Sequence, residues 1–356
     1  MRLRRIDRRG GLRAAALLLL LSSTLFLGGC ADLGYYLQSI DGQLQLNAAR
    51  RPLAEVAADA ATPEALKQKL VRAAAIREFA SRELLLPDNG SYRSYADLKR
   101  PFVVWNVFAA EEFSLEPRRW CFPFAGCVGY RGYFSKEAAE AFAAGLRAEG
   151  LEVQVAGIPA YSTLGWFDDP LLNTFMHYPD HELARLIFHE LAHQVVYVKG
   201  DAEFNESFAV AVELAGLQRW LAQASNAEWR EGAARAQERR RGFNALLREA
   251  RESLSVLYRS RVAPAEMRER KAAIFTQLKR DYAALKQGWG GFAGYDAFFE
   301  NINNAQLAAH SIYHALLPGM QRILAGRPDD LAAFYAEVKR LSEMPKAERD
   351  AALALP

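Results

Sequence analysis

The sequence HELAH, at residues 189–193, decides how the rest of this chain is interpreted. Residues four apart lie on the same face of an α-helix, so the imidazole rings of His189 and His193 can hold one metal ion. Glu190 lies beside that face. The surrounding residues 180–200 are largely apolar between an acidic start and a glycine, which is typical of a buried helix. The sequence therefore predicts a buried helix that carries two metal ligands.

Two histidines at this spacing favour zinc, which binds nitrogen and carboxylate ligands. Zinc lowers the pKa of a bound water to about 7, and a neighbouring carboxylate then accepts the proton as the water attacks a carbonyl carbon. Glu190 is the candidate general base and later proton shuttle. The alternative is a pair of helix histidines that are hydrogen-bonded to their neighbours and hold no metal.

A second motif, NESFA at residues 205–209, follows a short link. An Asn-Glu pair that opens a second helix resembles the third-ligand motif of the gluzincin metallopeptidases, and the sequence is similar to that of zinc aminopeptidases. The resemblance implies that Glu206 is the third ligand of one zinc ion per chain, with water in the fourth position. The interval from His193 to Glu206 is 13 residues, shorter than is usual in gluzincins, so we expect a tight connection.

Glu213 is the alternative third ligand. It lies one heptad beyond Glu206 on the same helix face, and Val210 occupies the position where the family often has an acidic residue. Glu213 is also a candidate to orient a zinc-bound histidine through a hydrogen bond. A solvated surface carboxylate is the third possibility.

Four segments together resemble a family of predicted bacterial aminopeptidases. They are residues 126–134, residues 160–167, the HELAH stretch with Gln194, and residues 303–305. The resemblance implies a zincin-like metallopeptidase core. It supports peptidase activity more strongly than a preference for free N-termini.

Other residues are candidates by their position. The oxyanion beside zinc usually has a second donor from Tyr, His or Arg; Tyr313 is the first candidate, followed by His310 and Tyr161. Each of these could equally be an ordinary core residue. Asp168 and Asp169 close a predicted extended segment that could hold a peptide by main-chain pairing, and they could receive its free α-ammonium.

Residues 1–29 have the pattern of an export signal, with a basic start and an apolar stretch over residues 14–29. That stretch is shorter than the roughly 20 residues that a transmembrane helix needs. The end, Leu27-Gly28-Gly29-Cys30, resembles the bacterial lipobox. The resemblance implies a lipid anchor at Cys30 on the periplasmic side of the envelope, and Ala31 resembles the outer-membrane sorting pattern. The alternative is an ordinary signal peptide that is cut nearby.

The whole chain of 356 residues has a formal net charge of +3. The export signal contains six arginines and one aspartate, so the remainder has a net charge of −2. Nucleic-acid binding therefore has no electrostatic basis in the mature part. Three cysteines exclude a disulfide-built scaffold. In an exported protein we expect a disulfide between Cys121 and Cys127, with a metal-binding pair as the alternative.

The predicted fold is α+β and predominantly helical, with one small sheet of about four strands and a long helical hairpin. Strands and extended segments are predicted over residues 102–108, 128–134, 151–155 and 161–167. The predicted organisation is a signal peptide (1–29), helices, sheet and active-site helices (30–225), a helical hairpin insertion (226–288) and C-terminal helices that complete the catalytic domain (289–356).

The sequence thus predicts a zinc-dependent peptidase that acts on peptides in the cell envelope, with an aminopeptidase as the preferred assignment. The alternatives are an envelope endopeptidase with the same zinc chemistry and a non-catalytic lipoprotein stabilised by its metal. Glu190 counts against the last, because a structural metal site does not need that residue. The sequence does not indicate a protein partner.

Overall fold

The computed structural model describes residues 33–122, 126–223, 226–312, 316–327 and 329–354. It divides into two compact units, residues 1–48 and residues 49–356. The described part of the first unit is a helix over residues 33–48. The predicted signal peptide, Cys30 and Tyr313 lie outside the described residues. No helix within those residues has both the length and the apolar character needed to cross a membrane.

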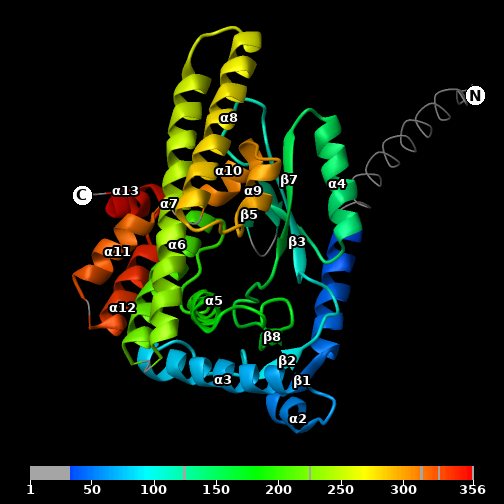
Figure 1. Cartoon of the computed structure of the whole chain (residues 1–356), viewed down its shortest axis with the longest axis vertical. Helices are drawn as coiled ribbons and strands as arrows, with labels where there is room; N and C mark the ends of the chain where they lie inside the picture. The colour runs from blue at the N-terminus through cyan, green and yellow to red at the C-terminus, as the bar shows by residue number, and fades with distance from the viewer. Residues whose placement is uncertain (1–32, 123–125, 224–225, 313–315, 328, 355–356) are drawn as a thin grey trace, which may run out of the picture. The chain divides into compact units, whose positions relative to one another are not determined.

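The largest sheet of the second unit is antiparallel and has the order β6-β3-β7. Strand β3 (Val104–Ala110) pairs with β7 (Glu152–Ile158) along its whole length, and with β6 (Arg131–Tyr133) on its other side. Every residue of β3 is buried, because helix α4 (Lys136–Ala148) and helix α10 (Asn304–Ser311) pack on the sheet from opposite sides (Figure 1). The predicted strands over residues 102–108 and 151–155 are therefore confirmed, each shifted by one to three residues.

We expected a single sheet of about four strands, but the described residues form two smaller sheets in addition to the β6-β3-β7 sheet. Strands β1 (Arg50–Pro52), β2 (Ser94–Ala96) and β8 (Leu171–Leu172) form one of them, with β2 and β8 parallel. Strands β4 (Trp120–Phe122) and β5 (Gly126–Val128) form the other, and a disulfide joins Cys121 to Cys127 across it. The predicted strand over residues 128–134 is therefore divided between β5 and β6.

The predicted extended segment over residues 161–167 is wrong, because these residues form a turn. Leu164 and Gly165 both have left-handed backbone angles, with φ of 57° and 81°. The hydroxyl of Thr163 accepts a hydrogen bond from the Phe167 amide and donates one to the Phe167 carbonyl, which closes the turn. This segment cannot pair with a substrate as an edge strand.

Three helices form the layer that positions the candidate site: α3 (Glu64–Leu84), α5 (Asp180–Ala192) and α6 (Ala202–Gln223). Helix α5 packs between the other two through apolar residues that are fully buried, Leu183, Ala184, Ile187, Phe188 and Leu191. Asp180 is the first helical residue and pairs with Lys69 and Arg72 of α3. The helix ends at Ala192, earlier than expected.

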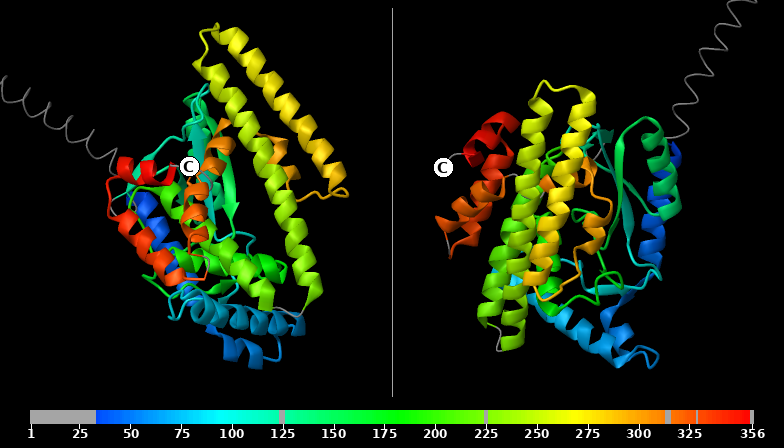
Figure 2. Two further views of the ribbon diagram at one scale, coloured as in Figure 1. Left: turned by 90° about the vertical axis from the view of Figure 1, so that its left-hand side faces the viewer. Right: turned by 45° about the horizontal axis from the view of Figure 1, so that its top comes forward.

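The charged region after residue 226 folds as an antiparallel hairpin of α7 (Ala227–Arg259) and α8 (Pro264–Gly288) (Figure 2). One face of α7 is apolar: Phe243, Leu247 and Leu254 pack with Leu278 and Tyr282 of α8. The opposite, polar face of α7 lies toward the candidate site. The remaining helices are α2 (Leu53–Ala58), α9 (Asp296–Glu300), α11 (Leu317–Ala325), α12 (Leu331–Ser342) and α13 (Lys346–Ala354).

The Asn303–Ala305 segment has a structural role. Asn303 caps α10 and forms a capping box with Gln306. Asn304 is completely buried. Its side-chain Nδ2 donates to the Glu112 carbonyl at 2.9 Å, and its Oδ1 accepts from the Tyr258 hydroxyl at 2.9 Å. Helix α10 is thereby fixed between the end of β3 and the hairpin.

Candidate active site

Three of the predicted ligands meet at the ends of α5 and α6. The Nε2 atoms of His189 and His193 are 3.2 Å apart, and Glu206 Oε2 is 3.2 Å from the first and 3.7 Å from the second. His193 directly follows α5 but keeps helical backbone angles, so the two rings stay on one face. Glu206 is the fifth residue of α6, which begins at Ala202. Three donor atoms from two helices therefore point at one position.

These distances fit a tetrahedral zinc site. Zinc bonds of about 2.0–2.1 Å at tetrahedral angles place neighbouring donor atoms about 3.3 Å apart. Glu206 Oε2 is buried and has no hydrogen-bond donor among the described residues, although two imidazole nitrogens surround it. A buried carboxylate oxygen without a donor is costly unless a cation satisfies it. Histidine and carboxylate donors in this arrangement suit zinc.

Glu213 lies behind His189, on the side away from Glu206. Its Oε2 is 3.0 Å from His189 Nδ1, and its other oxygen forms an ion pair with Arg185. Burial raises the pKa of the Glu213 carboxyl, but Arg185 and His189 outweigh it and lower that pKa to about 2. An ionised carboxylate at Nδ1 leaves Nε2 directed at the metal position. Glu213 therefore orients His189.

Burial also acts on both histidines. It lowers the pKa of His189, but the adjacent carboxylates of Glu206 and Glu213 outweigh it and raise that pKa well above its usual range. Burial lowers the pKa of His193 to about 4, so this ring is neutral at pH 7 and able to bind a metal. The protonation of the two histidines thus depends on the neighbouring carboxylates of Glu206 and Glu213.

The short connection between α5 and α6 is held by its own polar groups. The Asn205 side chain accepts from the Val198 amide at 2.7 Å and donates to the Val198 carbonyl at 2.8 Å. Gly200 has a φ of 78° and lies against Gly126 of the disulfide hairpin so closely that a Cβ on Gly126 would come within 2.8 Å of its nitrogen. Asn205 therefore closes the link that brings Glu206 to the histidines.

Glu190 is half-buried on the other flank of α5. Burial raises the pKa of its carboxyl to about 7; the positive charge of His189 lowers this pKa, and the negative charges of Glu206 and Asp169 raise it. A carboxyl group with a pKa near 7 can both accept and release a proton at neutral pH. This is the behaviour that a general base and proton shuttle needs.

Asp168 and Asp169 have different environments. Asp168 is exposed and lies against Gly90. Asp169 is only 5% exposed, and its Oδ2 accepts the Thr163 amide hydrogen at 2.9 Å. Burial raises the pKa of Asp169 to about 6, and its charge acts on Glu190 and on the buried Tyr92. Asp169 is therefore the aspartate beside the candidate site.

The structure does not single out one of the candidates for the oxyanion donor. Tyr313 lies outside the described residues. His310 Nε2 donates a hydrogen bond to Asn244 Oδ1 of α7 at 3.0 Å. Tyr161 packs edge-on against Phe134, and burial raises the pKa of its hydroxyl. Tyr92, which was not a candidate in the sequence, is fully buried and lies within range of the charges of Glu190 and Asp169.

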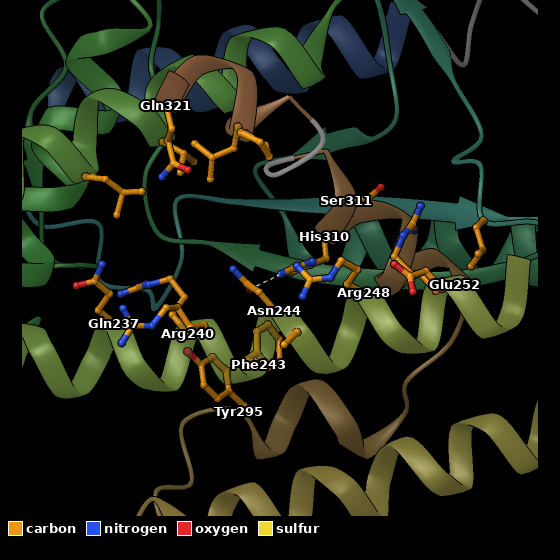
Figure 3. Close-up of a pocket in the computed structure, with 18 of the residues that line it drawn as sticks. Gln237, Arg240, Phe243, Asn244, Arg248, Glu252, Tyr295, His310, Ser311 and Gln321 are labelled. Atoms are coloured by element: carbon orange, nitrogen blue, oxygen red, sulfur yellow. Dashed lines mark hydrogen bonds between the residues drawn. The ribbon is translucent and has the colours of Figure 1, made fainter. Parts of the chain in front are cut away.

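A cleft of about 1510 Å³ opens on the His189 flank, between α6, α7, α10 and α11. His189, Arg185 and Glu213 form part of its wall, and α7 contributes a row of polar side chains. Figure 3 shows Arg240, Asn244, Arg248 and Glu252 along one face of α7, with Asn244 hydrogen-bonded to His310 of α10. The sequence predicts the hairpin but not this cleft.

Arg185, Asn205 and Tyr92 are the other residues that the sequence analysis missed. For Arg185 a signal was present: it lies four residues before His189, on the same helix face. Asn205 was quoted within its motif but given no role. Tyr92 has no local pattern that indicates its position.

A family model described as "Putative aminopeptidase" matches residues 34–353. No curated protein and no solved structure matches the chain.

Proposed function

Because the chain belongs to this aminopeptidase family, we propose that it is a zinc-dependent aminopeptidase whose metal is held by His189, His193 and Glu206. Family membership supports peptidase activity in general. The zinc assignment is carried by the convergence of three ligand atoms within 4.8 Å of one another. We further propose that α5 and α6, with the sheet beside them, form a zincin-like core.

The residues around the proposed zinc have separable roles. When bound, zinc would supply the Lewis acidity that polarises a peptide carbonyl and makes water acidic. Glu190 takes the proton from the attacking water and delivers it to the amine that leaves. Glu213, itself paired with Arg185, holds the His189 ring in place. Asn205 fixes the turn that carries Glu206.

The preference for a free N-terminus is assigned to Asp169. An α-ammonium buried without a carboxylate costs several kcal/mol. Asp169 is a buried carboxylate on the Glu190 flank and within range of the charge of Glu190. An ammonium beside it would favour its ionised form. This position supports an exopeptidase, whereas an endopeptidase would cleave blocked peptides equally well.

The metal assignment is tested by elemental analysis of the purified protein. We expect about one zinc per chain. His193→Ala should lose the metal and the activity, whereas His177→Ala, which changes an exposed histidine, should keep both. Circular dichroism of both variants checks that they are folded. Full zinc content in folded His193→Ala protein would refute the site.

We also propose that the protein is a lipoprotein of the cell envelope, anchored through Cys30 and facing the periplasm, in the outer membrane where there are two membranes. The support is the basic start, the apolar stretch and the Gly-Gly-Cys end of the first 30 residues. Several acyl chains on one cysteine give stable anchoring. Cys30→Ser should leave the protein unanchored or uncleaved. Membrane fractionation and the mass of the N-terminal peptide measure this, and an unlipidated wild-type Cys30 would contradict it.

A further inference from the structure

The cleft beside His189 is strongly basic. Six arginines and three glutamates line it: Arg185, Arg240, Arg241, Arg248, Arg251, Arg259, Glu116, Glu213 and Glu252. The export signal explains the positive charge of the full chain, and the remainder is slightly acidic. The positive lining is therefore a local feature of this cleft.

Two of the six arginines are already neutralised within the protein. Arg185 pairs with Glu213 and Glu182, and Arg240 pairs with Glu182 at 2.8 Å. These contacts hold the part of the cleft next to His189 in place. They leave no excess positive charge for a ligand at that end.

The other four arginines form an unneutralised row along α7. None of Arg241, Arg248, Arg251 and Arg259 makes an ion pair with a carboxylate in the described part of the chain. Their spacing of 7, 3 and 8 residues keeps them near one face of a helix. Glu116 and Glu252 are the acids that face them from the cleft lining. The row therefore retains a net positive charge.

Arg251 is the most enclosed member of the row. It is half-buried, and its Nη1 donates to the Leu307 carbonyl at 2.8 Å. Burial lowers the pKa of its guanidinium, and the charges of Glu116 and Glu203 only partly offset this. An anion in the cleft would compensate this cost. Arg251 thus has a structural contact with Leu307 and is also placed to bind an anion in the cleft.

We propose that the arginine row of α7, defined as Arg241, Arg248, Arg251 and Arg259, binds a carboxylate of the peptide, so that the enzyme selects acidic peptides. The proposal rests on the peptidase function proposed above, because it needs a peptide in the cleft beside His189. Guanidinium groups bind carboxylates by paired, charge-assisted hydrogen bonds. A charged cleft with apolar walls also attracts oppositely charged substrates during encounter.

The geometry indicates which part of the substrate is involved. Arg248 lies eight residues beyond Arg240, or about 12 Å along the helix axis. An extended peptide rises about 3.3 Å per residue, so about four residues cover this distance. The amine-binding Asp169 lies on the opposite flank of α5. The carboxylate therefore belongs to the residues that follow the scissile bond.

The experiment compares three peptides that differ in one group. The first has Glu about four residues after the scissile bond and an amidated C-terminus, the second has Gln there, and the third has Gln with a free C-terminal carboxylate. Fluorescence anisotropy with a protein that lacks residues 1–30 and contains the inactivating Glu190→Gln substitution measures binding without turnover. We expect the Glu peptide, the free-acid peptide or both to bind at least tenfold more tightly than the neutral peptide. The two acidic peptides distinguish a side-chain carboxylate from a C-terminal one.

The variants assign the preference to α7. Arg248→Gln should reduce it at least fivefold, Arg248→Glu should favour a Lys peptide, and 0.5 M salt should weaken the wild-type preference. Arg235→Gln is the matched control, because Arg235 is an exposed arginine of α7 outside the cleft and pairs with Glu231. Equal binding of all three peptides, or an unchanged preference in Arg248→Gln and in the Arg241→Gln/Arg248→Gln double variant, would overturn the proposal.

The outcome is separable from that of the peptidase proposal. Tighter binding of acidic peptides without any hydrolysis would refute the peptidase function and retain the arginine row. Hydrolysis of acidic and neutral peptides with equal kcat/KM and equal Kd would do the reverse.

Discussion

The two flanks of helix α5 have opposite electrostatic character. Asp169 and Tyr92 are buried on the Glu190 flank. The carboxyl groups of Asp169 and Glu190 both have raised pKa values. On the His189 flank lie Arg185, the ionised Glu213 and the arginine-lined cleft. One helix thus has buried acidic groups on one flank and a basic cleft on the other, with the proposed zinc ligands beside them.

This difference gives the site a direction. A peptide has a positive charge at its free N-terminus and a negative charge at its C-terminus, so complementary flanks favour one orientation. The N-terminal ammonium would lie on the Asp169 flank, and the residues after the scissile bond would enter the cleft. The following predictions test each flank and the centre between them.

The largest effect is expected at the centre. Glu190→Gln should lower kcat about 10³-fold, because an amide cannot accept a proton from water. The zinc content should be unchanged, since Glu190 is not among the converging ligand atoms. Steady-state kinetics and elemental analysis measure the two properties. A Glu190→Gln variant that keeps its activity would show that Glu190 is not the general base.

The acidic flank is tested with blocked substrates. Acetylation of the peptide N-terminus should lower kcat/KM about 100-fold, because it removes the ion pair with Asp169. Asp169→Asn should lower kcat/KM for the free peptide to a similar extent and leave the blocked peptide unaffected. Asp168→Asn is the matched control on the exposed neighbour. Equal cleavage of free and blocked peptides at an internal bond would instead identify an endopeptidase.

On the basic flank, Glu213 connects the metal site to Arg185. Glu213→Gln should weaken zinc binding about 10- to 100-fold, since the amide orients His189 less strongly than a carboxylate does. Glu206→Gln should weaken it more, because it removes a ligand. Competition with a chelator gives both affinities. The roles of the two glutamates would be exchanged if Glu213→Gln lost the metal and Glu206→Gln retained it.

The smallest effect concerns the stability cost of the acidic flank. The pKa of Asp169 is about 6 in the folded protein and 3.8 when unperturbed. Between pH 3.8 and pH 6 the folded protein therefore keeps a proton on Asp169 that the unfolded chain has lost. Stability therefore falls as the pH rises from about 4 to about 6, by up to about 3 kcal/mol from this residue.

Asp169→Asn should remove this part of the pH dependence. Thermal unfolding at pH 4 and pH 7.5 measures it, with Asp168→Asn as the control. The variant should lose less stability than the wild type between the two pH values. An identical pH dependence in both proteins would show that Asp169 is not a strained acid, and the contrast between the flanks would be weaker.

Strand prediction succeeded where the sequence is β-branched or aromatic over many residues. Strand β3 has such a run, strand β7 begins with an alternation of polar and apolar residues, and both were found to within three residues. Strands β1, β2 and β8 have only two or three residues each, too few for an alternating pattern, and were missed. The error at residues 161–167 has a different cause: the left-handed angles of Leu164 and Gly165 and the hydrogen bonds of Thr163 override the extended preference of the aromatic residues.

The sequence by itself selected the proposed ligands: helical periodicity paired His189 with His193, and the resemblance to the gluzincin motif favoured Glu206 over Glu213. Only the tertiary structure decided that Glu213 orients His189, that Asp169 rather than Asp168 lies beside Glu190, and that the charged face of α7 lines a cleft. The physical reason is the separation along the chain. Local backbone geometry fixes residues within a few helical turns, whereas contacts between distant segments depend on how whole helices pack, and no short sequence pattern records that packing.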